Sequence, residues 1–163
     1  MITRTILAIT FTALLSCLAI GCGSHPVTIP YVDLHYKPPG HGYQAVIEAS
    51  INGVSGRFVI DTGATAPTLT STAVHRCAIV VEPSQGRIVG PGGGVMTMMQ
   101  ATNITVRFAQ GFAIYWPRVL VFFGDLGEPS GTNDSFFGVI DYGSLRAHCA
   151  VMDMKKKTIT LTK

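Results

Sequence analysis

Charged residues are scarce in this chain. Of its 163 residues, 12 are Lys or Arg and 9 are Asp or Glu, so charged residues make up only 13% of the sequence. A nucleic-acid-binding surface needs many clustered cations, and so low a charge argues against a nucleic-acid partner. The one run of cations, from Lys155 to Lys157, lies between two apolar segments and is predicted to form a hairpin turn.

The sequence also lacks an apolar run long enough for a typical membrane-spanning helix. Near its N-terminus, one Arg precedes an apolar run from Ile6 to Ile20, which is the layout of an export signal. We expect residues 1–22 to be a signal peptide. The segment LAIGC resembles a bacterial lipobox, which makes Cys22 the expected lipidation site; plain secretory cleavage nearby is the alternative. The residue after Cys22 is Gly23 and not Asp, which resembles the pattern of lipoproteins that are sorted to the outer membrane. We therefore expect an exported protein that is anchored by its lipid to the outer membrane and faces the periplasm.

Cysteine is rare as well. Two of the four cysteines lie in the N-terminal segment, which leaves Cys77 and Cys149 for the folded domain. In an oxidising compartment such a pair can form a disulfide, and two buried free thiols are the alternative. No group of Cys and His has the spacing of a zinc site, so we expect neither a metal nor a cofactor.

Long helical patterns and internal repeats are absent too. Many short apolar segments separated by glycine-rich turns predict an all-β, barrel-like domain. We expect residues 23–42 to be a Pro- and Gly-rich tether with a candidate edge strand at Tyr31–Tyr36, and residues 43–163 to form the domain. A short helix is predicted at Ser71–Arg76, and the long strand near residues 112–123 is expected to break at Pro117.

One aspartate, Asp61, ends an apolar strand in the stretch RFVIDTGAT, Arg57–Thr65. A carboxylate at the end of a buried strand is costly unless it is compensated or used in chemistry. Without its neighbours, Asp61 would most simply be interpreted as a turn residue at the point where the chain leaves the strand. The Asp-Thr-Gly sequence occurs once in the chain.

Three segments together carry a resemblance to a known family. They are INGVSGRFVIDTGAT at Ile51–Thr65, GPGGG at Gly90–Gly94, and FFGVIDYGSLRAHCAVMDMKKKTITL at Phe136–Leu161. The chain resembles the retropepsin-like, single-lobed aspartyl proteases, in the form that bacteria export. That resemblance implies a closed all-β barrel with one or two short helices and a glycine-rich flap hairpin.

The resemblance also implies roles for individual residues. Asp61 would be the catalytic residue in the hydrolysis of a peptide or protein substrate, and Thr62, Gly63, Ala64 and Thr65 would support its loop. The flap that covers bound substrate would be formed by Gly92, Gly93 and Gly94. Water activation in this chemistry needs two carboxylates that share a proton, and one chain supplies one, so the expected enzyme is a homodimer.

In the family, a later apolar strand covers the catalytic loop. In this chain that covering strand departs from the family pattern at one position. Val139 and Ile140 are followed by Asp141, where the family has a glycine. A side chain there would crowd the catalytic loop or add a carboxylate beside Asp61. We favour the alternative, in which Asp141 caps the helix that begins near Tyr142, while Gly138 partly serves as the required glycine.

The leading hypothesis is therefore a lipid-anchored aspartic endopeptidase that works as a homodimer. Two other classes of protein remain open from the sequence. One is a catalytically inactive module of the same fold that binds a peptide or protein, and the other is a structural envelope lipoprotein.

Overall fold

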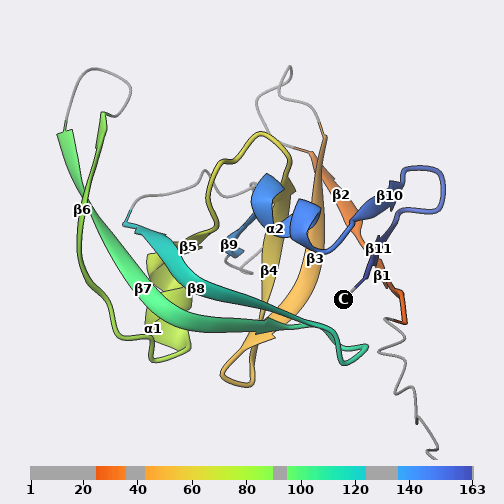
Figure 1. Ribbon diagram of the computed structural model, residues 1–163, viewed down its shortest axis with the longest axis horizontal. Helices are drawn as coiled ribbons and strands as arrows, with labels where there is room; N and C mark the ends of the chain where they lie inside the picture. The colour runs from red at the N-terminus through yellow and green to blue at the C-terminus, as the bar shows by residue number, and fades with distance from the viewer. Residues whose placement is uncertain (1–24, 36–42, 90–94, 124–135, 163) are drawn as a thin grey trace, which may run out of the picture.

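The computed structural model of the chain describes residues 25–35, 43–89, 95–123 and 136–162 (Figure 1). The predicted signal peptide, Cys22 and the flap glycines Gly92, Gly93 and Gly94 lie outside these ranges. Within the described ranges the chain forms eleven strands and two short helices. In chain order these are β1 (Val27–Pro30), β2 (Val32–His35), β3 (Tyr43–Ile51), β4 (Val54–Asp61), β5 (Thr68–Thr70), α1 (Ser71–Arg76), β6 (Glu82–Val89), β7 (Val95–Arg107), β8 (Ala113–Phe122), β9 (Phe136–Asp141), α2 (Tyr142–Ala147), β10 (Val151–Asp153) and β11 (Thr158–Leu161).

The larger sheet closes on itself. Its eight strands run in the order β2-β3-β4-β9-β5-β8-β7-β6, and a further pairing between β3 and β7 at Ser50 and Arg107 closes a barrel of six strands. The predicted all-β closed barrel with one or two short helices is confirmed. Strands β6 and β7 form a long antiparallel hairpin that projects from the barrel (Figure 1). The predicted flap glycines fall between these two strands in the sequence and lie outside the described residues.

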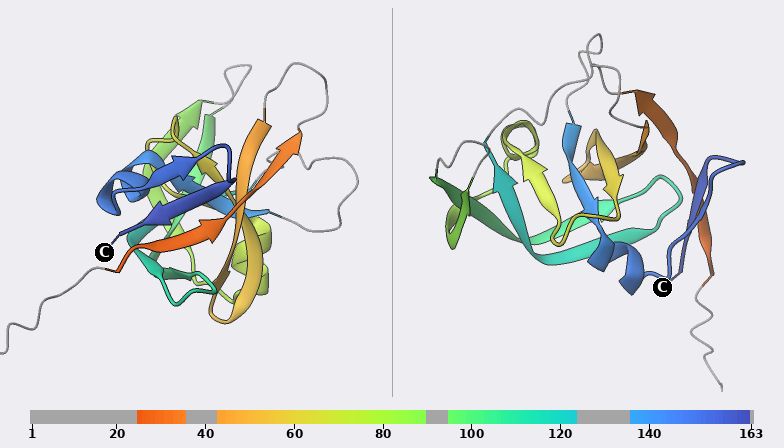
Figure 2. Two further views of the ribbon diagram at one scale, coloured as in Figure 1. Left: turned by 90° about the vertical axis from the view of Figure 1, so that its right-hand side faces the viewer. Right: turned by 90° about the horizontal axis from the view of Figure 1, so that it is seen from above.

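A second, three-stranded sheet joins the two ends of the described chain. Strand β1 pairs with β11, which pairs with β10, and the three strands lie side by side in the left view of Figure 2. Ile29 and Tyr31 are buried against the domain. The boundary expected at residue 43 is therefore too late, because β1 and β2 already pair with strands of the domain and Ile29 of β1 belongs to the main hydrophobic cluster.

The Lys155–Lys157 segment forms the turn between β10 and β11, as predicted. Asp153 organises this turn, since its Oδ1 accepts hydrogen bonds from the backbone N–H groups of Lys155 at 3.0 Å and Lys156 at 2.9 Å. The hydrogen bond from the Lys156 N–H is the main reason that the pKa of Asp153 lies below its ordinary value. The cations are thus part of a solvated turn.

Both helices are short and follow a strand directly. The predicted helix at Ser71–Arg76 is confirmed as α1, and its cap is Thr70, whose Oγ1 accepts from the Ala73 N–H at 3.2 Å. The break predicted at Pro117 is wrong, because β8 runs through this residue. Among the described residues, no helix is both long and apolar enough to cross a membrane.

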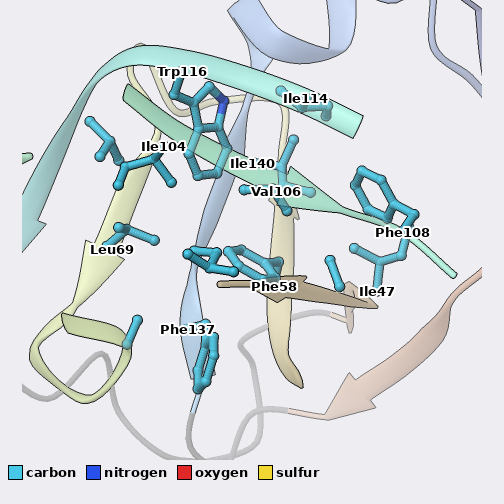
Figure 3. Close-up of a cluster of buried hydrophobic side chains, with 14 of the residues drawn as sticks. Ile47, Phe58, Leu69, Ile104, Val106, Phe108, Ile114, Trp116, Phe137 and Ile140 are labelled. Carbon is cyan, nitrogen blue, oxygen red and sulfur yellow. The ribbon is translucent and has the colours of Figure 1, made fainter. Parts of the chain in front are cut away.

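Strand β4 lies in the wall of the barrel, between β3 and β9. Phe58, Val59 and Ile60 are buried in succession, so both faces of this strand are covered. The Phe58 ring packs edge-on against Trp116 and Phe137, with ring centroids 6.3 and 6.1 Å apart. Figure 3 shows these side chains filling the barrel. The core therefore fixes the strand that ends in Asp61.

Gly138 allows β5 and β9 to approach each other closely. A Cβ atom at this position would lie 2.0 Å from the Thr68 backbone oxygen and 3.2 Å from Leu69 Cα. Backbone atoms cannot yield as the end of a flexible side chain can, so position 138 requires glycine. The glycine needed in the covering strand is Gly138, three residues before Asp141.

The substitution Gly138→Ala is expected to destabilise the protein by about 3 kcal/mol, because the new methyl group overlaps the β5 backbone. Urea unfolding of the variant and the parent measures this loss. Gly53→Ala is the matched control, since Gly53 has a φ of +79° but nothing within 4 Å of its Cβ position. The control should lose only about 1 kcal/mol from backbone strain. Equal losses for the two variants would show that the close approach is not the constraint.

Candidate functional site

The Asp61 carboxylate belongs to a tight turn at the end of β4. Asp61 Oδ1 accepts a hydrogen bond from the Gly63 N–H at 2.8 Å, and the Asp61 backbone oxygen accepts one from the Ala64 N–H at 3.2 Å. A Cβ atom at Gly63 would lie 3.2 Å from Asp61 Oδ1, which is a tight contact. The turn therefore holds one carboxylate oxygen in place and leaves the partly exposed side chain accessible.

Helix α2 supports this turn from the next strand. β4 and β9 are parallel neighbours, and their register pairs Asp61 with Asp141. Tyr142, the first residue of α2, donates its backbone N–H to the Ala64 oxygen at 3.2 Å. The Ala64 carbonyl oxygen thus accepts a hydrogen bond from the start of α2, and the Ala64 N–H donates one to the Asp61 backbone oxygen. Ala64 joins the Asp-Thr-Gly loop to the adjacent strand–helix junction.

Asp141 caps α2, as its favoured interpretation predicts. Its Oδ2 accepts from the Gly143 N–H at 3.0 Å, and its Oδ1 accepts from the Ser144 N–H at 3.2 Å and from the Ser144 hydroxyl. The side chain is only 3% exposed. These hydrogen bonds satisfy a carboxylate that would otherwise be costly to bury. The less favoured alternative, crowding of the catalytic loop, is not seen, because the carboxylate accepts its hydrogen bonds from α2.

The remaining loop residues lie at the surface. Thr62, Gly63 and Thr65 are exposed, while Ala64 is partly buried. Beside the loop is a hollow of about 340 Å³, and its lining includes Thr62, Tyr142 and Leu145. Tyr142 is 52% exposed. An apolar recess therefore adjoins the loop on the side of α2.

Sequence patterns point to Asp61 and Asp141, whereas Tyr142 and Ser144 were missed. Tyr142 acts through its backbone, which no side-chain pattern reveals. Ser144 stands three residues after the cap, where a polar side chain often completes a capping arrangement, and that spacing was the available signal.

The candidate disulfide is not formed in the structure. Cys77 and Cys149 are both free, the first buried after α1 and the second exposed after α2. Cys77 packs in the main hydrophobic cluster, and the two thiols follow helices at separate places in the fold. Burial raises the pKa of the Cys77 thiol above its ordinary value, and the Arg76 charge opposes this shift.

Within the described ranges, no three His, Cys, Asp or Glu side chains come together as metal ligands would. The carboxylate of Asp61 is held by a backbone N–H group, and the carboxylate of Asp141 by α2. The groups present can position a water molecule or a polar substrate atom beside Asp61 and can transfer a proton.

The two thiols are expected to differ in reactivity in the native protein. At pH 8, Cys149 should react with iodoacetamide on the order of tenfold faster than Cys77, because the thiolate is the nucleophile and burial disfavours it at Cys77. Mass spectrometry of a soluble form that begins at Gly23 measures both rates, and urea should make them similar. If neither thiol reacts until a reductant is added, the two free thiols described here are contradicted.

Comparisons with known proteins agree with this geometry. The family model described as aspartyl protease matches residues 47–132, which is more than half of the chain. A search of curated proteins gave no match. The fold is similar to the retroviral protease-like domain of Ddi1 from Leishmania major, with a TM-score of 0.52 and 19% identity over 83% of this chain and 89% of that one. It is also similar to a retropepsin-like aspartic protease from Rickettsia conorii, with a TM-score of 0.53 and 16% identity over 85% of this chain and 90% of that one. The chain, with its Asp-Thr-Gly turn at the end of β4, belongs to the aspartyl protease family.

Proposed function

We propose that the protein is an aspartic endopeptidase that acts as a homodimer, with Asp61 of each chain forming the catalytic pair. The observation that carries this proposal is the Asp-Thr-Gly turn, which holds a partly exposed carboxylate by the Gly63 N–H. Membership of the aspartyl protease family supports the same chemistry.

The second carboxylate has to come from another chain. Asp141 pairs in register with Asp61, but it is 3% exposed and its oxygens accept hydrogen bonds from residues of α2. A carboxylate so occupied is not free to hold the attacking water. A twofold axis at the Asp-Thr-Gly loop would bring two Asp61 side chains together. The exposure of Thr62 and Gly63 supports this arrangement, because these residues would face the second chain.

The two aspartates would divide the chemistry between them. Mutual repulsion keeps one carboxyl protonated while the other stays ionised. The ionised Asp61 takes a proton from water as the water oxygen attacks the scissile carbonyl carbon. The protonated Asp61 donates a hydrogen bond to the carbonyl oxygen, and a proton then passes to the leaving nitrogen as the C–N bond breaks. The Gly63 N–H keeps the carboxylate oriented throughout.

The substrate would bind between the Asp-Thr-Gly loops and the β6–β7 hairpins. The paired arms of this hairpin, joined by cross-strand pairs such as Val89 with Val95, support a flap at Gly92, Gly93 and Gly94. We also propose that the mature protein is anchored through lipid on Cys22 and works at the outer membrane, facing the periplasm. The lipobox-like LAIGC segment supports this location.

The test is peptide cleavage by the soluble form that begins at Gly23. This form should cleave peptides when it is incubated with a diverse peptide library at mildly acidic to neutral pH. The substitution Asp61→Asn should lower the rate of cleavage by about 10²-fold or more, since the side-chain amide of asparagine cannot act as the general base. Asp153→Asn makes the same chemical change in the β10–β11 turn and should leave cleavage unchanged.

Two outcomes would contradict the proposal. The first is a folded, dimeric parent that cleaves nothing, and the second is cleavage that survives Asp61→Asn. If the parent binds peptides without cleaving them, the protein is a binding module of the same fold.

A further inference from the structure

A chain of hydrogen bonds connects the barrel core to the start of α2. The buried Trp116 on β8 donates its indole Nε1–H to Ser144 Oγ at 2.8 Å. The Ser144 hydroxyl in turn donates to Asp141 Oδ1. Trp116 and Asp141 are each 3% exposed, so water competes little with either end of the chain.

These contacts go beyond the needs of a helix cap. Asp141 already accepts hydrogen bonds from the Gly143 and Ser144 N–H groups, which satisfies two of the four free donors at the start of α2. The added hydroxyl bond ties that cap to a side chain of the rigid core. A six-residue helix has little stability of its own, so its position depends on such contacts.

The cap in turn fixes the Asp-Thr-Gly loop. Tyr142 follows Asp141 directly, and its backbone N–H donates to the Ala64 oxygen at 3.2 Å. Ala64 donates its own N–H to the Asp61 oxygen. If the hydrogen bonds of the cap weaken, the first turn of α2 can shift, and the Tyr142 N–H that holds the Asp-Thr-Gly loop shifts with it.

We propose that Trp116, Ser144 and Asp141 form a positioning clamp that holds the Asp-Thr-Gly loop through the Tyr142 N–H. None of the three contacts the reacting atoms, so they are positioning residues. The effect on catalysis rests on the proposed peptidase function, whereas the effect on the loop does not. A displacement of a catalytic group by about 1 Å can lower the rate of the reaction on the order of 10²-fold.

Amide hydrogen exchange measured by NMR tests the clamp without reference to activity. Ser144→Ala removes the hydroxyl and should speed exchange of the Tyr142 N–H about tenfold, the usual effect of losing one buried hydrogen bond. Trp116→Phe should do the same, and Ser144→Thr, which keeps a hydroxyl, should restore protection. Because Trp116 is the only tryptophan, its indole N–H gives one signal that should shift in Ser144→Ala.

The control variant is Ile51→Val, a core truncation at the end of β3 that pairs with Val54, at the opposite end of β4 from Asp61. It should leave the exchange rate of the Tyr142 N–H at the parental value, relative to other core amides. If Ile51→Val and Ser144→Ala speed Tyr142 exchange equally, or if Ser144→Ala has no local effect, the clamp is overturned.

Peptide cleavage supplies the second measurement. Ser144→Ala should lower kcat about tenfold and change KM less than about twofold, because the substrate contacts remain and the catalytic group is misplaced. A parent that cleaves no peptide would refute the proposed function, and the exchange experiment alone would then decide the clamp. A raised KM with an unchanged kcat would overturn the positioning role.

Discussion

The parallel pairing of β4 with β9 is the constraint on which the candidate site depends. It places Asp61 and Asp141 side by side at the ends of two buried strands. The pairing is possible because Phe58 and Phe137 fill the barrel and because Gly138 lets β5 lie against β9. The loop and α2 both start from these strand ends, so the core determines where the Asp61 carboxylate lies.

The two strands end in similar local sequences, Asp-Thr-Gly and Asp-Tyr-Gly, and in similar turns. In each turn the aspartate accepts a hydrogen bond from the glycine N–H two residues later. Burial then separates their roles. Asp141 is enclosed and binds α2, whereas Asp61 stays partly exposed. One aspartate therefore supports the site, and the other is available for chemistry.

Much of this arrangement was predictable from the sequence. The apolar strand before Asp61, the short α1 helix and the cap at Asp141 follow from local patterns that act over a few residues. The role of β1 in the domain was missed because it depends on pairing with β11, at the other end of the described chain. The continuity of β8 was missed because proline usually interrupts a strand, whereas β8 pairs with β7 on both sides of Pro117. The Trp116–Ser144 hydrogen bond was also beyond prediction, because it joins residues 28 apart whose proximity exists only after the barrel has closed.

The central claim is that catalysis needs one Asp61 from each of two chains. The most direct measurement joins two copies by a flexible linker and places Asp61→Asn in one of them. Cleavage by the linked pair of parental copies, and a fall of about 10²-fold or more when one copy is changed, would agree with a shared pair of aspartates. If the changed pair keeps half of the parental activity, each chain works alone and the account is contradicted.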